Sequence, residues 1–531
     1  MFWADRICDD IQNSERFKAK IASGTSLVIR DEKTASGAVH VGSMRGVAIH
    51  GLISEVLLAR GVANTFRYEI NDADPMDGMP SYLDANQFAP FMGKPLYQVP
   101  SPDGVAKNFA EFYGSEFEEV IHDTGFAPEF YRLRPFYEDG SFDEVIKMAL
   151  LKADRIREIY KEVSGSTKGG QWLPLSVICE HCGKMGTTTA LSFDGEKVTY
   201  KCEPNKVEWA VGCGHEGSVS PFGGSAKLPW KVEWAAKWKV FGVDIEGAGK
   251  DHSTKGGSRD VANHISREVF EHEPPFDIPY EFFLVAGKKM SSSKGNAATA
   301  RAVADLLPAH IFRLALLGKE PKRQIDFDPV GDTVPLLFDW YDRIAEKAWS
   351  GIEDDDTRLF TTIHPKNSLL AVENRFLPRF STVAYLSQMP HIDAYDYFAG
   401  QKGSDFTKTD HAELEQRLTY ASFWLAEYAP DDYKFELQEE LPEAARTFSD
   451  DQKAALSKLE VFIEANETLD GQALHAAMHD IKAETGIDPK AFFSAIYIAF
   501  LGKESGPKAG WFLSVLDREF VLNRLKEIAV H

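Results

Sequence analysis

Apolar residues along the first seventy positions predict a strand, a helix and a second strand. The stretch TSLVIR (25–30) is apolar and β-branched, as in a short buried strand. Apolar residues then recur at near-helical spacing, at Val47, Ile49, Ile53, Val56 and Leu57. Gly61 follows Arg60, where a left-handed helix cap favours glycine. Apolar residues alternate in TFRYEI (65–70), which predicts a second strand, parallel to the first after a right-handed crossover.

The pattern changes several times along the rest of the chain. It is helical from GVAKNFAEFYGSEFEEVI (104–121) to IREIYKEVSG (156–165), and GSTKGG (165–170) is typical of a linker. Residues 171–227 are rich in Gly, Thr and Cys, with strand-like pieces such as KVTYKCE (197–203). Strands are predicted again at FGVDIEG (241–247) and YEFFLVAG (280–287), so an insertion interrupts the first sheet. From about residue 300 nearly everything is predicted to be helical.

Composition and charge narrow the class of protein. A chain of 531 residues is too long for one core. A net charge of −22 argues against coating nucleic acid by bulk attraction, although local basic surfaces remain open. No apolar run is long enough to span a membrane, and the N-terminus lacks the apolar core of a signal peptide. We therefore expect no membrane partner. Because the chain has only five cysteines, a disulfide scaffold is not expected, and a reducing cytoplasm fits best.

Three polar motifs follow predicted strands. HVGS (40–43) opens the first helix, where backbone N–H groups and the helix dipole favour an anion. GKKMSSSKGN (287–296) places lysines and serines after an apolar strand, a composition suited to folding over a triphosphate. GAGKDH (247–252) combines glycines that admit a close ligand with Asp251, which could accept from ribose hydroxyls.

Four of the five cysteines fall within 35 residues, at Cys179, Cys182, Cys202 and Cys213. Paired thiolates presented by tight turns suit tetrahedral Zn²⁺, and two further cysteines favour a structural zinc site over a redox pair. Cys213 is the preferred fourth ligand, and His215 is the alternative.

Together, these motifs resemble those of class I aminoacyl-tRNA synthetases. HVGS resembles the HIGH signature and KMSSSKG the KMSKS signature. Within that class the chain is similar to the class I lysyl-tRNA synthetases, through SGAVHVGSMRG, INDADPMDGMP, PWKVEWAAKWKVFGVDIEGAGKDH and KKMSSSKGN. The resemblance is strong through residue 330, and beyond it only helical character is shared.

The resemblance implies ATP-dependent ligation of L-lysine to tRNA(Lys) through lysyl-adenylate, with Mg²⁺ accompanying ATP. Catalytic groups would be His40, Ser43, Lys289 and Lys294. ATP would contact His40, Gly42, Ser43, Gly249, Asp251, Met290, Ser291, Ser292, Ser293 and Lys294, and lysine would contact Thr34, Trp230, His252 and Tyr280. Glu69, Asp72 and Asp74 are candidate partners of the lysine ammonium. Some relatives hold a second metal through histidines after a PDP-like turn, but SPDGVAKNFAE (101–111) has none, so no second site is expected.

The chain departs from the family signatures at three positions. Ser43 replaces the second histidine of HIGH, Ser292 replaces the lysine after Met-Ser, and Ala35 stands where proline is usual. None of these departures removes the basis for activity. Three alternatives remain: a synthetase for glutamate or arginine, a non-catalytic paralogue that binds lysine or tRNA, and a small nucleotidyltransferase like pantothenate synthetase. The helical half argues against the last.

The predicted fold class is an α/β multidomain protein. It has a Rossmann-type parallel-sheet catalytic domain, an inserted helical and zinc-bearing connective region, and an all-α C-terminal half. The catalytic domain would comprise 1–100 and 228–300, around a connective insertion at 101–227 whose zinc-binding subdomain is 171–227. Residues 301–375 would form a helical stem-contact domain and 376–531 a helical anticodon-binding domain. We expect a monomer.

Overall fold

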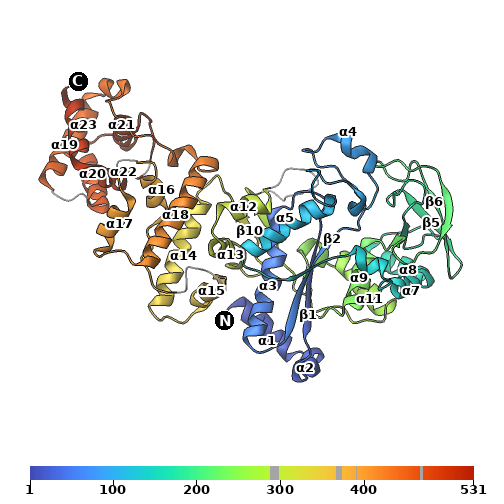
Figure 1. Ribbon diagram of the computed structural model, residues 1–531. Helices are drawn as coiled ribbons and strands as arrows, with labels where there is room; N and C mark the ends of the chain where they lie inside the picture. Colours follow the sequence, from blue (N-terminus) through green and yellow to red (C-terminus); the bar gives the residue numbers. More distant parts are fainter. Residues whose placement is uncertain (288–297, 366–372, 390–391, 467–469, 507, 531) are drawn as a thin grey trace. The chain divides into compact units, whose positions relative to one another are not determined.

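The chain divides into two compact units. The computed structural model describes residues 1–287, 298–365, 373–389, 392–466, 470–506 and 508–530 (Figure 1). The first unit comprises Met1–Phe327 and Ser350–Ser368, and the second comprises Asp328–Trp349 and Leu369–His531. The five-segment domain division inferred from sequence stays a prediction.

A parallel sheet organises the first unit, as predicted. Strand β1 (Leu27–Thr34) pairs with β2 (Asn64–Asn71), and β2 pairs with β3 (Glu129–Arg132). Helix α3 (Met44–Ala59) makes the crossover between β1 and β2, and Gly61 follows it with φ of 77°. The predicted strand–helix–strand unit is therefore confirmed, whereas β3 lies in a region predicted to be entirely helical.

Helix α3 is the central helix of this unit. Thirteen of its sixteen residues are buried, which explains why it carries apolar side chains on all sides rather than a single stripe. The expectation that no apolar run is long enough to span a membrane was wrong for Val41–Ala59, which is long and apolar enough by length and composition. However, 78% of its 18-residue apolar window is buried inside the fold. Its apolar character is accounted for by its place in the core.

The prediction of a regular strand at FGVDIEG was wrong. Only Ile245 pairs there, through single parallel bridges to Ile29 and Phe276. The backbone N–H groups of Asp244 and Ile245 both donate to the Val28 carbonyl, which breaks the regular ladder. The sheet is still completed beside β1, but by bridges rather than by a strand. The second predicted strand exists as β9 (Phe283–Val285), which pairs in parallel with β10 (Ile325–Phe327).

The insertion contains helices followed by small antiparallel sheets. Strands β5 (Thr188–Phe193), β6 (Val198–Cys202) and β7 (Glu216–Val219) form one sheet, and β4 (Ser176–Val177) pairs with β8 (Ala226–Lys227). The insertion does not have a core of its own. One hydrophobic cluster joins Ile156, Tyr200, Trp238 and Ile265, which links the inserted helices and strands to the helices after them.

The remaining elements are helices. Those of the first unit are α1 (Trp3–Asn13), α2 (Glu15–Ala22), α4 (Ala85–Phe88), α5 (Phe109–Asp123), α6 (Arg134–Glu138), α7 (Asp143–Leu151), α8 (Ala153–Ser164), α9 (Trp230–Phe241), α10 (Lys250–Ser253), α11 (Ser258–Glu268), α12 (Ala300–Leu306), α13 (Ala309–Leu317) and α15 (Asp355–Ile363). Those of the second unit are α14 (Thr333–Trp349), α16 (Phe380–Leu386), α17 (Ala394–Lys402), α18 (Lys408–Glu427), α19 (Asp450–Ala465), α20 (Gly471–Thr485), α21 (Pro489–Leu501), α22 (Ala509–Ser514) and α23 (Arg518–Val530). Short 3₁₀ turns occur at Val41–Ser43, Ala89–Phe91, Leu96–Gln98, Asp431–Tyr433 and Glu443–Thr447.

The described part of the second unit contains helices but no strand. A buried polar cluster ties α14 to α18. The Arg417 side chain, fully buried, donates to Asp342 and to Glu413, and Arg375 donates to Glu413 and to the Tyr341 hydroxyl. Each buried charge in this cluster therefore has a partner of opposite sign, which burial requires.

Candidate active site

A cavity of about 300 Å³ opens at the carboxyl end of β1. Ligands bind at this edge of open parallel sheets because the strand ends and helix starts leave backbone groups free there. The wall comprises Asp31, Glu32, Lys33, His40, Gly42, Ser43, Arg45, Tyr68, Trp230, Trp234, Glu246, Ala248, Gly249, Asp251, His252, Tyr280, Glu281, Phe282 and Phe283. Segments from positions 31 to 283 thus meet at one site.

The HVGS turn forms one wall, as the sequence predicted. His40 precedes the 3₁₀ turn Val41–Ser43, which leads directly into α3. A backbone bridge between His40 and Thr299 fixes this turn against the start of α12. The helix therefore points its N-terminus at the cavity, where its dipole favours a phosphate.

An aromatic wall faces this turn. The rings of Trp230 and Trp234 on α9 are stacked with centroids 6.0 Å apart, and the His252 ring meets both edge-on at 5.6 and 6.1 Å. Trp230, His252 and Tyr280, predicted to contact the amino acid, all line the cavity. So do Gly249 and Asp251, predicted to contact ATP. Stacked indoles suit an aliphatic stem that ends in a cation.

Thr34 and three predicted acids lie elsewhere. The Thr34 hydroxyl donates to Asp74 at 2.7 Å, and neither residue lines the cavity. Glu69 is fully buried and accepts from Arg30 and Lys237, while Asp72 accepts from the backbone N–H of Arg134. These contacts give each acid a structural partner, so none of the three is placed to meet an amino acid in this cavity.

A buried network of charges supports the cavity floor. The fully buried Arg30 donates to Glu32, Glu69 and Glu246. Lys237 donates to Glu32, to Glu69 and, at 3.2 Å, to Glu233. Although burial works against the charged form, the carboxylates around it raise the pKa of Lys237 well above its ordinary value. The network holds β1, β2 and α9 together.

Residues missed by the sequence reasoning include Asp31, Glu32, Trp234 and Glu246. A signal for the first two was present, because LVIRDEKT carries charges along an otherwise apolar strand. Trp234 lies four residues after Trp230, so both must share one face of α9. No such local signal marks Glu246, whose carboxylate accepts from Arg30, Trp234 and Trp238.

The lysine- and serine-rich motif GKKMSSSKGN follows strand β9 in the sequence. Lys289, Met290, Ser291, Ser292, Ser293 and Lys294 lie outside the described residues. The described strand β9 ends at Val285, two residues before the segment begins at Gly287, and Phe283 of this strand lines the cavity.

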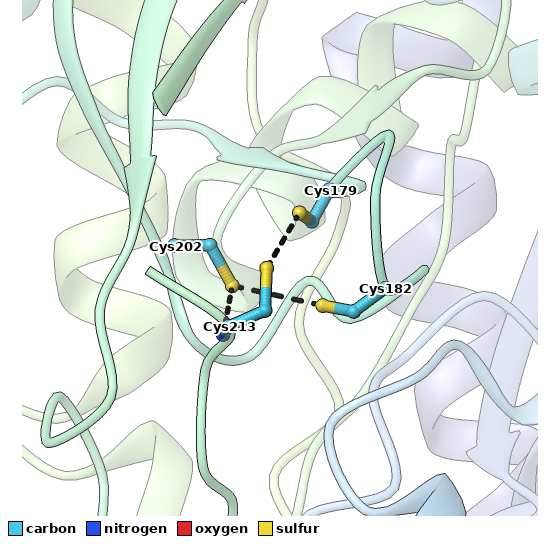
Figure 2. Close-up of side chains that lie close together, drawn as sticks. All are labelled: Cys179, Cys182, Cys202 and Cys213. Carbon is cyan, nitrogen blue, oxygen red and sulfur yellow. Dashed lines mark hydrogen bonds between the residues drawn. The ribbon is translucent and has the colours of Figure 1, made fainter. Parts of the chain in front are cut away.

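Four cysteine thiols converge at the turns of the inserted sheet (Figure 2). The sulfurs of Cys179 and Cys213 are 3.6 Å apart, those of Cys182 and Cys202 are 3.7 Å apart, and all four lie within 4.8 Å of one another. A tetrahedral ion with Zn–S bonds of about 2.3 Å requires sulfur–sulfur edges of about 3.8 Å. Disulfides would need about 2.0 Å, so the four thiols fit a zinc site.

His215 is not part of this group. Its ring stacks on His181 with centroids 5.9 Å apart and lies 6.0 Å from the Tyr200 ring. Its backbone carbonyl accepts from Cys202 N–H. The geometry therefore favours Cys213 over His215 as the fourth ligand.

Comparison with known proteins identifies the class. The family model for tRNA synthetases class I (K) matches residues 1–367, and the anticodon binding domain model matches residues 415–529. The parallel sheet and its cavity thus belong to the class I aminoacyl-tRNA synthetases. Within that class, this chain is a member of the class I (K) family, as the sequence resemblance implied.

Relatives match along nearly the whole chain. The lysine–tRNA ligase of Methanosarcina barkeri is 33% identical over 546 residues, covering 99% of this chain and 97% of that protein. The lysine–tRNA ligase of Thermoplasma volcanium is 32% identical over 532 residues, covering 99% of each. Among solved structures, a glutamate–tRNA ligase from Elizabethkingia meningosepticum aligns over 95% of this chain and 99% of its own, with 11% identity and a TM-score of 0.39.

Proposed function

We propose that this chain ligates L-lysine to tRNA(Lys) with ATP, through a lysyl-adenylate intermediate. The observation that carries the proposal is its similarity over almost its full length to lysine–tRNA ligases, together with membership of the class I (K) family. Because both the catalytic and the anticodon-binding segments match, the complete two-step reaction is supported rather than amino-acid binding alone.

The charge of the cavity supports a cationic amino acid. Five carboxylates line it, and Lys33 and Arg45 are the only lysine and arginine that do so among the described residues. Arg45 is also committed elsewhere, because its guanidinium donates to the carbonyls of Leu316, Lys319 and Glu320. Lysine or arginine side chains pair with Glu32, Glu246 and Glu281, so the charge that attracts an ammonium comes chiefly from Asp31. A carboxylate side chain would be repelled there, which disfavours the glutamate alternative.

In the first step the lysine carboxylate attacks the α-phosphate of ATP in line, and pyrophosphate leaves. His40 and Ser43, at the start of α3, would hold phosphate oxygens, with Gly42 and Gly249 admitting the nucleotide closely and Asp251 accepting from ribose. The reaction needs no protein nucleophile, so positioning and charge stabilisation supply the rate. Magnesium would accompany ATP and neutralise its phosphates.

The motif GKKMSSSKGN, which follows β9, would stabilise the negative charge that develops on the phosphates during the reaction. Lys289 and Lys294 would offset negative charge on the leaving pyrophosphate, with Met290, Ser291, Ser292 and Ser293 in contact with ATP. In the second step, a terminal ribose hydroxyl of tRNA(Lys) attacks the adenylate carbonyl, and AMP leaves.

We further propose that Cys179, Cys182, Cys202 and Cys213 hold one structural zinc ion. The support is the tetrahedral spacing of their sulfurs and the absence of a shorter, disulfide-like distance within this group. Zinc bound here would fix the turns before β5 and β7, in a sheet too small to be stable by packing alone.

The organisation of the chain completes the proposal. Residues 301–375 would contact the tRNA stem and 376–531 the anticodon stem-loop, for which the anticodon binding domain match at 415–529 gives support. We propose a monomer that acts in the cytoplasm without a membrane partner.

The decisive experiment is ATP–pyrophosphate exchange with each of the twenty amino acids. Among the twenty amino acids, only lysine is expected to support exchange. The enzyme is also expected to charge tRNA(Lys) under the same conditions. Exchange with arginine or glutamate instead would reassign the substrate. Lysine binding without any exchange would point to the non-catalytic paralogue.

A further inference from the structure

We propose that Asp31, together with the hydroxyl of Tyr280, binds the side-chain ammonium of the amino-acid substrate. This rests on the proposed function, since it names the group that would distinguish lysine from an uncharged amino acid. None of the three acids suggested by the sequence lines the cavity, so the partner must be sought among Asp31, Glu32, Glu246, Asp251 and Glu281.

Three of these five carboxylates are already neutralised. Glu32 accepts from Lys237 at 2.7 Å and from Arg30. Glu246 accepts from Arg30 at 2.8 Å, and Glu281 pairs with Lys250 at 2.8 Å. Each therefore has a fixed cation, and a substrate ammonium would gain little from it.

Asp251 and Asp31 differ in burial. The Asp251 side chain is 42% exposed, where water screens its charge, whereas that of Asp31 is 13% exposed. A buried, charge-assisted contact discriminates more strongly between a cation and a neutral group than an exposed one. Burial thus selects Asp31.

The hydrogen-bond partners of Asp31 are neutral. Its Oδ1 accepts from the backbone N–H of Glu32 at 2.8 Å, and its Oδ2 lies 3.2 Å from His50 Nδ1. The backbone N–H of Gly247 donates to His50 Nε2 at 2.7 Å. Burial lowers the pKa of His50, but Asp31, Glu246 and the Gly46 carbonyl together raise it above its ordinary value. Gly247 can nevertheless donate to Nε2 only while that nitrogen carries no proton.

His50 is therefore a positioning residue. With Nε2 accepting, its proton lies on Nδ1, which faces both Asp31 and the Gly46 carbonyl at 2.8 Å. The ring, fully buried on α3, thus orients the carboxylate without cancelling its charge. Among the described residues, no lysine or arginine forms an ion pair with Asp31. Lys33, which also lines the cavity, interacts with its charge at longer range.

The hydroxyl of Tyr280 is the second group of the proposed ammonium-binding site. A Cβ built on Gly46 would lie 2.5 Å from Asp31 Oδ2 and 2.7 Å from the Tyr280 hydroxyl, so both oxygens border the same small space. Burial and the charge of Asp31 raise the pKa of Tyr280 well above its ordinary value, which keeps the hydroxyl protonated. A carboxylate and a hydroxyl beside indole rings are suited to an alkyl ammonium.

The test compares Asp31→Asn with the wild-type chain in pyrophosphate exchange, using lysine and norleucine, which lacks the ammonium. We expect the KM for lysine to rise about 10- to 100-fold, and the preference for lysine over norleucine to fall by a similar factor. Asp244→Asn is the matched control. That aspartate is also buried, pairs with Lys20 at 2.6 Å and does not line the cavity, so it should leave the preference unchanged.

Equal loss with lysine and norleucine, or an unchanged KM for lysine, would overturn the assignment. If Asp31→Asn does not fold, Tyr280→Phe removes only the hydroxyl and should still lower the preference for lysine over norleucine. An unchanged preference in that variant would count against ammonium binding by Asp31 and Tyr280. If the wild-type chain itself activates an amino acid other than lysine, the proposed function fails, independently of how the variants behave.

Discussion

Replacing Gly46 by alanine tests how tightly the cavity is built. The added Cβ would lie 2.5 Å from Asp31 Oδ2 and 2.7 Å from the Tyr280 hydroxyl, whereas ordinary contact begins at 3.4 Å. The carboxylate must therefore withdraw by about 0.9 Å and the hydroxyl by about 0.7 Å. A displacement near 1 Å in a preorganised site lowers the reaction rate by up to about 100-fold. We therefore expect kcat/KM for lysine to fall about 10- to 100-fold.

Stability should respond much less than activity. Overpacking costs about 1–3 kcal/mol, but alanine recovers about 1 kcal/mol of helix propensity relative to glycine within α3. We therefore expect a decrease in the free energy of unfolding of about 0–2 kcal/mol, visible as a Tm lower by a few degrees. Pyrophosphate exchange with varied lysine, beside a thermal melt, measures both quantities.

The matched control is Gly51→Ala on the same helix. There the added Cβ would lie 2.4 Å from Phe126 Cδ1, so it overpacks the core without touching the cavity. This variant should lose stability and keep its KM for lysine. Equal kinetic losses in the two variants, or an unchanged kcat/KM in Gly46→Ala, would refute the idea that Gly46 is required by the cavity.

Four further outcomes are expected. Cys182→Ser should lower bound zinc from one ion per chain and destabilise the insertion, as metal analysis and limited proteolysis would report. Cys8→Ala should keep both zinc and exchange activity, because this cysteine is buried apart from the four-thiol group and burial raises its pKa to about 12. Lys289→Ala should lower the maximal exchange rate and leave the affinity for lysine measured by calorimetry unchanged, since its charge matters most in the transition state. A chain ending at Tyr433 should retain lysine-dependent exchange and lose tRNA(Lys) charging, and full charging by this fragment would contradict an anticodon role for the deleted helices.

The choice of Tyr433 as an end point depends on the structure. The sequence suggested a boundary near residue 375, but Tyr341 and Asp342 of α14 bond to Arg375 and Arg417. A cut at residue 375 would leave a buried acid on α14 without its arginine, which is strongly destabilising. Helical periodicity in the sequence does not reveal such long-range ion pairs, so a domain boundary inferred from it can separate them.

Local patterns were enough to predict the strand–helix–strand unit. Apolar β-branched residues, helical spacing and Gly61 are each short-range signals, and all agree with β1, α3 and β2. The failure at FGVDIEG has a specific cause, since Asp244 and Ile245 both bond to the Val28 carbonyl instead of continuing a ladder. That arrangement depends on a strand more than 200 residues away in sequence.

The candidate site divides in the same way. The sequence determined the class of chemistry, because HVGS, GAGKDH and the cysteine spacing carry their meaning within a few residues. Only the tertiary structure decided which acid could meet the substrate. Asp31 and Glu69 are both acids on neighbouring strands, yet Glu69 is neutralised by Arg30 and Lys237 whereas Asp31 faces the cavity beside a neutral histidine. Burial and pairing of a charge are set by residues distant in sequence, so they cannot be read from the residue type or from its immediate neighbours.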